Sequence, residues 1–213
     1  MDDPYQGFPP GFFARDDESP DTTFYAPARL VTHIDDRAIL AVGQVYEQLG
    51  VQGRVLDLMS SWINHFVERP DELTVLGMNE TELDNNPMAH HRVVHDLNAD
   101  PHLPLPDSRY DAVVCCVSVD YLTRPIEVFR EVRRVLAPGG PFVCTFSNRV
   151  FPTKAIRGWL YASESDRPGI VAEYFRRSGG WRSLHAQQFL DDAMGDPLWG
   201  VWARKAPLDA QAS

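Results

Sequence analysis

The feature of the sequence that most restricts the fold is the stretch 110–148. Near its start is the segment 111–118, in which every residue between Asp111 and Ser118 is apolar, as is typical of a strand covered by helices on both faces rather than on one. Thr123 and Pro125 then provide a helix cap and a first-turn proline, and a second apolar run follows at 142–146. This order predicts a parallel strand–helix–strand unit, whose strands end at the sheet edge where such folds bind ligands.

The remaining sequence continues the alternation of strands and helices. Residues 35–49 have apolar side chains on one helical face, acidic residues at the start and Gly50 at the end, so they predict a helix. Further strands are predicted at 54–58, 73–78, 92–96, 181–189 and 198–205, and shorter helices near 61–68, 80–86, 153–161 and 169–177. Turn residues between the last two strands predict an antiparallel hairpin.

We therefore expect one α/β domain over residues 35–206. The preceding segment, 1–34, is rich in proline and aromatic residues, which predicts either a lid over the domain or a contact between two copies in a homodimer. Residues 207–213 are predicted to be a flexible tail.

Composition and charge argue against several classes of function. The chain has 30 acidic and 20 basic side chains, a net charge of −10 and no basic block, so neither nucleic acid nor an anionic membrane surface is an expected partner. No apolar run is long enough to cross a bilayer, and Met1-Asp2-Asp3-Pro4 is unlike a secretion signal, which predicts a cytoplasmic protein. The three cysteines lie in predicted buried strands and are expected to be reduced.

The residues at the strand ends resemble those of the class I S-adenosylmethionine (SAM) dependent methyltransferases, from about Arg54 to Lys205. The resemblance is carried by Asp57, Asp96, Asp111, the turn 134–140 and the closing segment 196–205. It implies a Rossmann-like doubly wound sheet of seven strands, mostly parallel with an antiparallel last strand, with helices on both faces and SAM as cofactor. The chain departs from the family at the first turn, where Met59-Ser60-Ser61-Trp62-Ile63 replaces the glycine-rich loop.

The resemblance also implies a set of cofactor contacts at the strand ends. Asp57 is expected to meet the ammonium group of SAM, Asn79 the ribose hydroxyls, and Asp96 with Leu97 the adenine. In the altered turn, Ser60 and Ser61 either bind the amino-acid end of SAM at a helix start or only cap that helix. Asn79 and Asp96 have corresponding structural alternatives, a helix cap and an ordinary strand-end residue. The predicted cofactor-binding residues are Asp57, Met59, Ser60, Ser61, Trp62, Asn79, Asp96, Leu97 and Ser118.

Polar side chains after the fourth and fifth strands are the catalytic candidates. Methyl transfer depends chiefly on positioning, with a base needed where the acceptor carries a proton, and Asp120 is either that base or a loop carboxylate. The predicted catalytic residues are Asp120, Tyr121 and Asn148, and the predicted substrate-binding residues are Tyr25, His33, Lys154 and Arg157. Lys154 and Arg157 form either a clamp for an anion or a solvated helix face. The histidines lack complete ligand spacing, so no metal site is expected.

Three functions are compatible with the sequence. The first is transfer of a methyl group from SAM to a small-molecule acceptor. The second is a non-methylating reaction of SAM, such as an intramolecular cyclisation or a lyase step, which the altered first turn suggests. The third is a non-catalytic methyltransferase-like scaffold that binds a partner through residues 1–34.

Overall fold

The protein is built around a seven-stranded sheet with the strand order β3-β2-β1-β4-β5-β7-β6, and its computed structural model describes residues 3–207. The strands from β1 to β5 pair in parallel, and β7 runs antiparallel to both β5 and β6. The strands are β1 (Arg54–Leu58), β2 (Glu72–Gly77), β3 (His91–Val94), β4 (Ala112–Cys116), β5 (Pro141–Phe146), β6 (Trp181–Leu190) and β7 (Leu198–Lys205). This topology confirms the predicted Rossmann-like sheet. The predicted tail, except for Pro207, lies outside the described residues.

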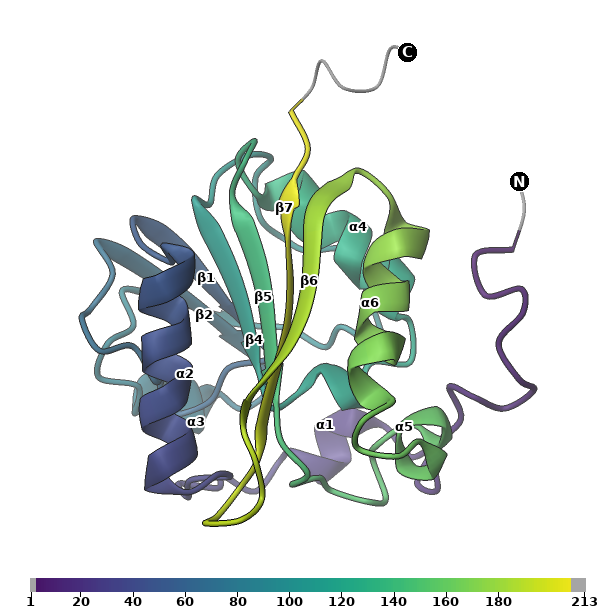
Figure 1. Ribbon diagram of the computed structural model, residues 1–213. Helices are drawn as coiled ribbons and strands as arrows, with labels where there is room; N and C mark the ends of the chain where they lie inside the picture. The colour runs from purple at the N-terminus through teal and green to yellow at the C-terminus, as the bar shows by residue number, and fades with distance from the viewer. Residues whose placement is uncertain (1–2, 208–213) are drawn as a thin grey trace.

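Helices cover both faces of the sheet (Figure 1). α2 (Asp36–Leu49) lies on one face, and α4 (Pro125–Val135) and α6 (Arg167–Ser178) lie side by side on the other. α2 begins where the sequence predicts because the Asp35 side chain accepts a hydrogen bond of 2.8 Å from the Ala38 N–H. It ends at Gly50, whose φ of 69° is the left-handed conformation that glycine adopts without strain.

α4 also begins as predicted, with Pro125 in its first turn, but its cap is different. Arg124 is the residue that precedes the helix, and the Thr123 hydroxyl instead donates a hydrogen bond of 3.0 Å to the Asn98 side chain. The helix packs through Phe129, which is fully buried, against Phe142 of β5 and Phe175 of α6 at ring-centroid distances of 4.9 and 4.8 Å. This aromatic core fixes α4 and α6 to the sheet.

Two predicted helices differ in the structure. Residues 61–68 form no helix, because their side chains bind separate partners: the Trp62 indole donates to the Val31 carbonyl oxygen, and Phe66 packs against Tyr46 of α2. The helix predicted near 153–161 is confined to its second half. The short helical elements are α1 (Asp21–Phe24), α3 (Glu80–Asp84), the 3₁₀ turn η1 (Val119–Tyr121) and α5 (Arg157–Tyr161).

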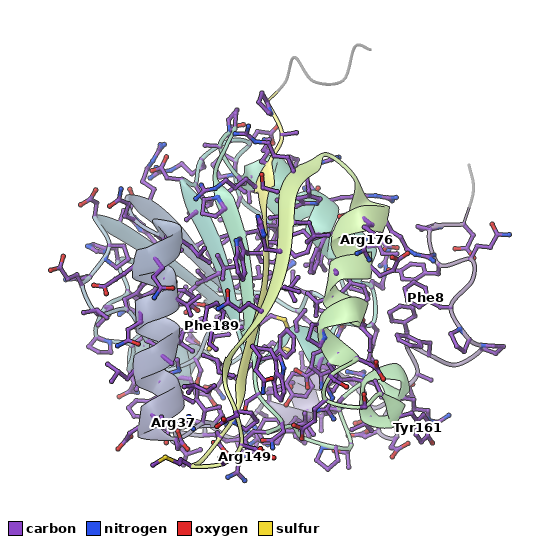
Figure 2. The ribbon with its side chains drawn as sticks, viewed as in Figure 1. Phe8, Arg37, Arg149, Tyr161, Arg176 and Phe189 are labelled. Carbon is purple, nitrogen blue, oxygen red and sulfur yellow. The ribbon has the colours of Figure 1, made fainter. Side chains whose placement is uncertain are left out.

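The N-terminal aromatic residues pack on their own domain. Figure 2 shows Phe8 beside α6, where the guanidinium of Arg177 lies 4.4 Å from its ring centroid. Phe13 forms edge-to-face pairs with Phe8 and with Phe12. It also contacts Tyr174 of α6, with ring centroids 6.2 Å apart. These aromatic residues therefore pack against α6 of the same chain.

From this aromatic cluster the chain crosses to the edge where the parallel strands end (Figure 1). We call residues 15–33, which make this crossing and include α1, the strap. Lys154 anchors the strap: its ammonium nitrogen lies 2.7 Å from the Ser19 carbonyl oxygen and 3.1 and 3.2 Å from carboxylate oxygens of Asp17 and Asp21. Among residues 3–207, none of the helices has the length and apolar composition of a membrane-crossing segment.

Candidate functional site

A cavity of about 350 Å³ lies at the carboxyl edge of the parallel strands, between the strand ends and the strap. Ligands of doubly wound sheets bind at this edge because the loops after neighbouring strands diverge there. The predicted site residues on its wall are Tyr25, His33, Asp57, Met59, Ser60, Ser61, Asn79, Asp96, Leu97, Ser118 and Tyr121. The structure thus brings together predicted site residues that are almost one hundred positions apart in the sequence. Residues of the strap form one wall of the cavity.

Asp57, near the end of β1, is a buried carboxylate that has no cationic partner among residues 3–207. Its Oδ2 accepts hydrogen bonds from the Ser60 hydroxyl, at 2.7 Å, and from the Asn64 amide. Both donors are neutral, and burial raises the pKa of Asp57 to about 7 in spite of them. A cation in the cavity would favour the ionised form of this carboxylate, so Asp57 is suited to bind a positively charged ligand.

The first turn achieves a tight path without glycine. Met59 has a φ of 57°, a conformation that costs energy for any residue with a Cβ atom. The Ser60 N–H donates to the Leu76 carbonyl oxygen at 2.7 Å, and a Cβ atom on Gly77 would lie only 2.2 Å from the Ser60 carbonyl oxygen. The glycine that permits close backbone approach is therefore in β2, and no helix begins at this turn, so the helix start that both alternatives for Ser60 and Ser61 assume is wrong.

A second strained residue lies beside the first turn, since the Ser118 hydroxyl that follows it is 3.4 Å from the Met59 carbonyl oxygen. Val117, directly after β4, has a φ of 47°, which is unfavourable for a β-branched side chain. The next residue, Ser118, donates its hydroxyl hydrogen bond to the Cys116 carbonyl oxygen at 3.0 Å. Strained backbone of this kind concentrates at functional sites, where the surrounding structure holds it in place.

α3 links the strap to the first turn. Asn79 caps α3 by accepting from the Glu82 N–H, and its amide nitrogen donates to the carbonyl oxygens of Tyr25 and Ala26 at 2.8 and 3.0 Å. Glu82 accepts from the Ser61 hydroxyl and from the Arg29 N–H, each at 2.7 Å. Both amide hydrogens of Asn79 thus hold the strap, and only its side-chain oxygen can accept a further hydrogen bond, such as one from a ribose hydroxyl.

The segment after β3 forms the opposite end of the cavity. Asp96 accepts hydrogen bonds from the N–H groups of Asn98 and Ala99 at 2.9 and 3.1 Å, which fixes the turn. Asn98 in turn donates to the Asp21 carboxylate of the strap at 2.8 Å and to the Tyr121 carbonyl oxygen at 2.9 Å. Asp96 and Leu97, the predicted adenine contacts, therefore lie in a turn on the cavity wall that these hydrogen bonds hold in place.

Five predicted site residues lie outside the cavity: Trp62, Asp120, Asn148, Lys154 and Arg157. The side chain of Asp120 is only 2% exposed and does not line the cavity, which favours the alternative of a loop carboxylate over that of a base. The anion clamp predicted from Lys154 and Arg157 is wrong: Lys154 is fully buried in its contacts with the strap, and Arg157 pairs with Asp16 on the surface.

The sequence interpretation missed several residues of the cavity wall. The most important are Arg29, Asn64, His65, Glu82, Asn98, Arg149 and Phe151. One signal was present for Glu82, since an asparagine followed by glutamate three residues later is a helix capping pattern. Figure 2 shows Arg149 at the lower edge of the sheet, where its Nε donates to Asp196 at 2.7 Å.

Two of the cavity histidines are neutral at neutral pH. Burial lowers the pKa of His33, and it lowers the pKa of His65 to about 4. His33 contacts the ring of Phe151 edge-on, with centroids 5.5 Å apart. A neutral imidazole on the cavity wall can accept a proton, so His33 adds a possible base to a cavity that Asp120 does not enter.

The buried carboxyl group of Asp120 predicts a pH dependence of stability that can be tested without any ligand. Burial raises its pKa to about 7, so the native state holds a proton that the unfolded state loses near pH 4. Its contribution to stability is therefore lost as the pH rises from about 4 to 7. We expect Asp120→Asn to be more stable than the parent protein by about 1–3 kcal/mol at pH 8, and by little at pH 4. Urea denaturation across this range measures the difference, and a constant difference would contradict the assignment.

Comparisons with known proteins bear on the fold and the family of this chain. Residues 52–144 match the model of a methyltransferase domain family. Similar solved structures include SAM-dependent methyltransferases from Mesorhizobium loti, at 19% identity and a TM-score of 0.55, and from Archaeoglobus fulgidus, at 15% and 0.59. These matches cover 78% and 80% of this chain and 98% and 95% of the other.

A third similar structure is the (4+2)-cyclase SpnF, at 15% identity and a TM-score of 0.57, with 87% of this chain and 91% of that chain covered. No curated protein sequence matches this chain. At such identities the solved structures establish the fold alone. Residues 52–144 therefore match a methyltransferase domain, in a chain that has the fold of SAM-dependent methyltransferases.

Proposed function

We propose that the protein is a methyltransferase that transfers the methyl group of SAM to a small-molecule acceptor. The observation that carries this proposal is Asp57, a buried carboxylate on the cavity wall whose hydrogen-bond donors in the described part of the chain are both neutral. SAM carries an ammonium and a sulfonium group, and either cation would compensate the buried charge.

The cavity wall fits the parts of SAM in the order that the family implies. Asp57 and Ser60 would hold the amino-acid end, the free lone pair of Asn79 the ribose, and Asp96 with Leu97 the adenine. When bound, SAM supplies an electrophilic methyl group on its sulfonium. The binding of its amino-acid end rests on side chains of the first turn, because the helix that usually follows this turn is missing.

A small acceptor fits the size and enclosure of the cavity better than a macromolecule. Its volume of about 350 Å³ is near the lower end of the range for small-molecule sites. The strap covers it through the hydrogen bonds of Asn79 and Glu82, so water would be excluded and the acceptor held close. Neutral His33 would accept a proton from an acceptor that loses one.

The first test is binding of SAM to the unmodified protein. SAM at 100 times its dissociation constant is expected to add about 2.7 kcal/mol to the free energy of unfolding, measured by urea denaturation. Adenosine, which lacks both cations, serves as the control and should stabilise the protein much less at equal concentration. No stabilisation by saturating SAM would exclude both enzymatic functions and leave the scaffold.

A non-methylating reaction of SAM is the second candidate, because the first turn has lost both its glycines and its helix. SpnF, a cyclase, has a similar fold, and this similarity concerns the fold alone. Incubation with SAM alone, followed by mass spectrometry, distinguishes the two reactions. Turnover without any acceptor would favour the second candidate over methyl transfer.

A further inference from the structure

Arg29 is a cationic residue of the cavity wall that the proposed cofactor contacts do not use. Its guanidinium lies over the Phe24 ring, 4.6 Å from the centroid, and 5.9 and 5.5 Å from the centroids of Tyr25 and Phe151. The three rings hold the half-buried side chain in place at the cavity wall. Its position is therefore set by packing rather than by an acidic partner.

The hydrogen bonds of this guanidinium leave donors available. Within residues 3–207 they go only to backbone carbonyl oxygens, those of Phe24 at 2.9 Å and Pro27 at 3.3 Å, and no carboxylate there forms an ion pair with it. A guanidinium has five N–H donors in a planar fork, so several remain for a ligand.

The acidic residues near Arg29 are already bound to other groups. Asp21 pairs with Arg15 at 2.7 Å and with Lys154 at 3.2 Å. Glu82 accepts from the Ser61 hydroxyl and from the backbone N–H of Arg29 itself. The positive charge of Arg29 therefore stays uncompensated at the cavity wall, in the same way that the negative charge of Asp57 does.

We propose that the Arg29 guanidinium binds a carboxylate on the methyl acceptor, which makes the acceptor a small organic acid with an aromatic or other apolar body. A single available cation suits a singly charged carboxylate better than a phosphate dianion, since Arg149 is already paired with Asp196. Tyr121, Tyr25 and Phe151 form the apolar wall beside it. This inference rests on the proposed function for the identity of the acceptor.

The guanidinium and the backbone of Arg29 contact different parts of the sheet edge. Its ring contact Phe151 follows β5, whereas its backbone N–H donates to Glu82 of α3, the helix that Asn79 caps after β2. In the strand order β3-β2-β1-β4-β5, the guanidinium therefore contacts the half of the edge opposite to β2 and β3, while the backbone lies beside the predicted ribose contact. The amino-acid carboxylate of SAM is the other possible source of the same chemistry, and the experiment includes an arm for it.

The test uses benzoate and its neutral isostere benzamide as probes, titrated into the full-length protein and followed by NMR. The parent protein is expected to bind benzoate more tightly than benzamide. Arg29→Met should weaken benzoate binding about tenfold or more and leave benzamide binding unchanged. Arg176→Met is the matched control, because Figure 2 shows Arg176 on α6, away from the lower edge, where its exposed side chain pairs with Glu173.

Arg29→Lys is a second variant that keeps the charge of the side chain but not its planar fork, in case Arg29→Met does not fold. It should bind benzoate with an affinity between those of the parent and Arg29→Met. Equal affinity of the parent protein for benzoate and benzamide, or an unchanged preference in both variants, would overturn the proposal.

The second arm measures S-adenosylhomocysteine, which has an amino-acid carboxylate, and 5′-methylthioadenosine, which has none. Unchanged affinities for both in Arg29→Met support the acceptor as the source. A loss confined to S-adenosylhomocysteine, with benzoate unaffected, would assign the carboxylate to the cofactor and overturn the acceptor proposal. Preferential benzoate binding in a protein that binds neither nucleoside would refute the proposed function while the carboxylate site remained.

Discussion

Replacing Lys154 with methionine is expected to lower the free energy of unfolding by about 3–5 kcal/mol, the usual cost of removing one partner from a buried ion pair. The ammonium group is fully buried, close to the carboxylates of Asp17 and Asp21, and it donates to the Ser19 carbonyl oxygen. Methionine fills a similar volume, so the loss would come from the uncompensated polar groups rather than from a cavity. Urea denaturation at pH 7 measures the change.

Arg157→Met is the matched control for this substitution. Arg157 also connects the segment after β5 to the N-terminal residues, but its pair with Asp16 is 3.4 Å long and exposed to solvent. Exposed pairs contribute about 1 kcal/mol or less, so the control should be close to the parent protein. Equal and small effects of the two substitutions would show that the strap is not held by Lys154.

Replacing Asp57 with asparagine is expected to weaken SAM binding by about 10- to 100-fold while making the ligand-free protein more stable at pH 8. The loss of affinity follows from removal of a charged hydrogen-bond acceptor for the cofactor. The gain in stability follows from the raised pKa, since the native carboxylate must ionise in a buried site as the pH passes about 7. Calorimetric titration with SAM and urea denaturation of the same samples measure both quantities.

Asp111→Asn separates this effect from a general loss of a strand-edge carboxylate. Asp111 lies next to β4 and pairs with Arg54 at 2.9 Å, away from the cavity wall, and its pKa is lowered by that side-chain hydrogen bond. The substitution should reduce stability and leave SAM affinity unchanged, so it differs from Asp57→Asn in both quantities. If Asp57→Asn bound SAM as tightly as the parent protein, Asp57 would not be the cation site.

The sequence predicted the elements whose signals are local. The helix 36–49 has its cap at Asp35 and its end at Gly50, both of which act within one turn of the helix. The strands β4 and β5 follow from apolar runs that only a sheet covered on both faces buries. The region 61–68 has similar apolar content, but Trp62 and Phe66 bind groups on the strap and on α2, contacts that no local periodicity encodes.

Site residues at the ends of strands could be predicted from the sequence. Residues whose contacts involve the strap could not. Asp57, Asp96 and Tyr121 lie on the cavity wall because the carboxyl ends of parallel strands share one edge. Lys154 was assigned to an anion because its partners, Asp17 and Asp21, are more than 130 positions away in the sequence. Arg29 was missed for the same reason, since its ring contact with Phe151 links the strap to the loop after β5.

The close approach of Gly77 to the first turn couples two positions that are seventeen residues apart in the sequence. A methyl group at position 77 would collide with the Ser60 carbonyl oxygen, which is backbone and cannot turn aside. Among homologous sequences, any larger residue at 77 should therefore occur only together with an altered loop at 59–61. Covariation of these positions would show when, in evolution, the requirement for a residue without a Cβ atom passed from the loop after β1 to position 77 in β2.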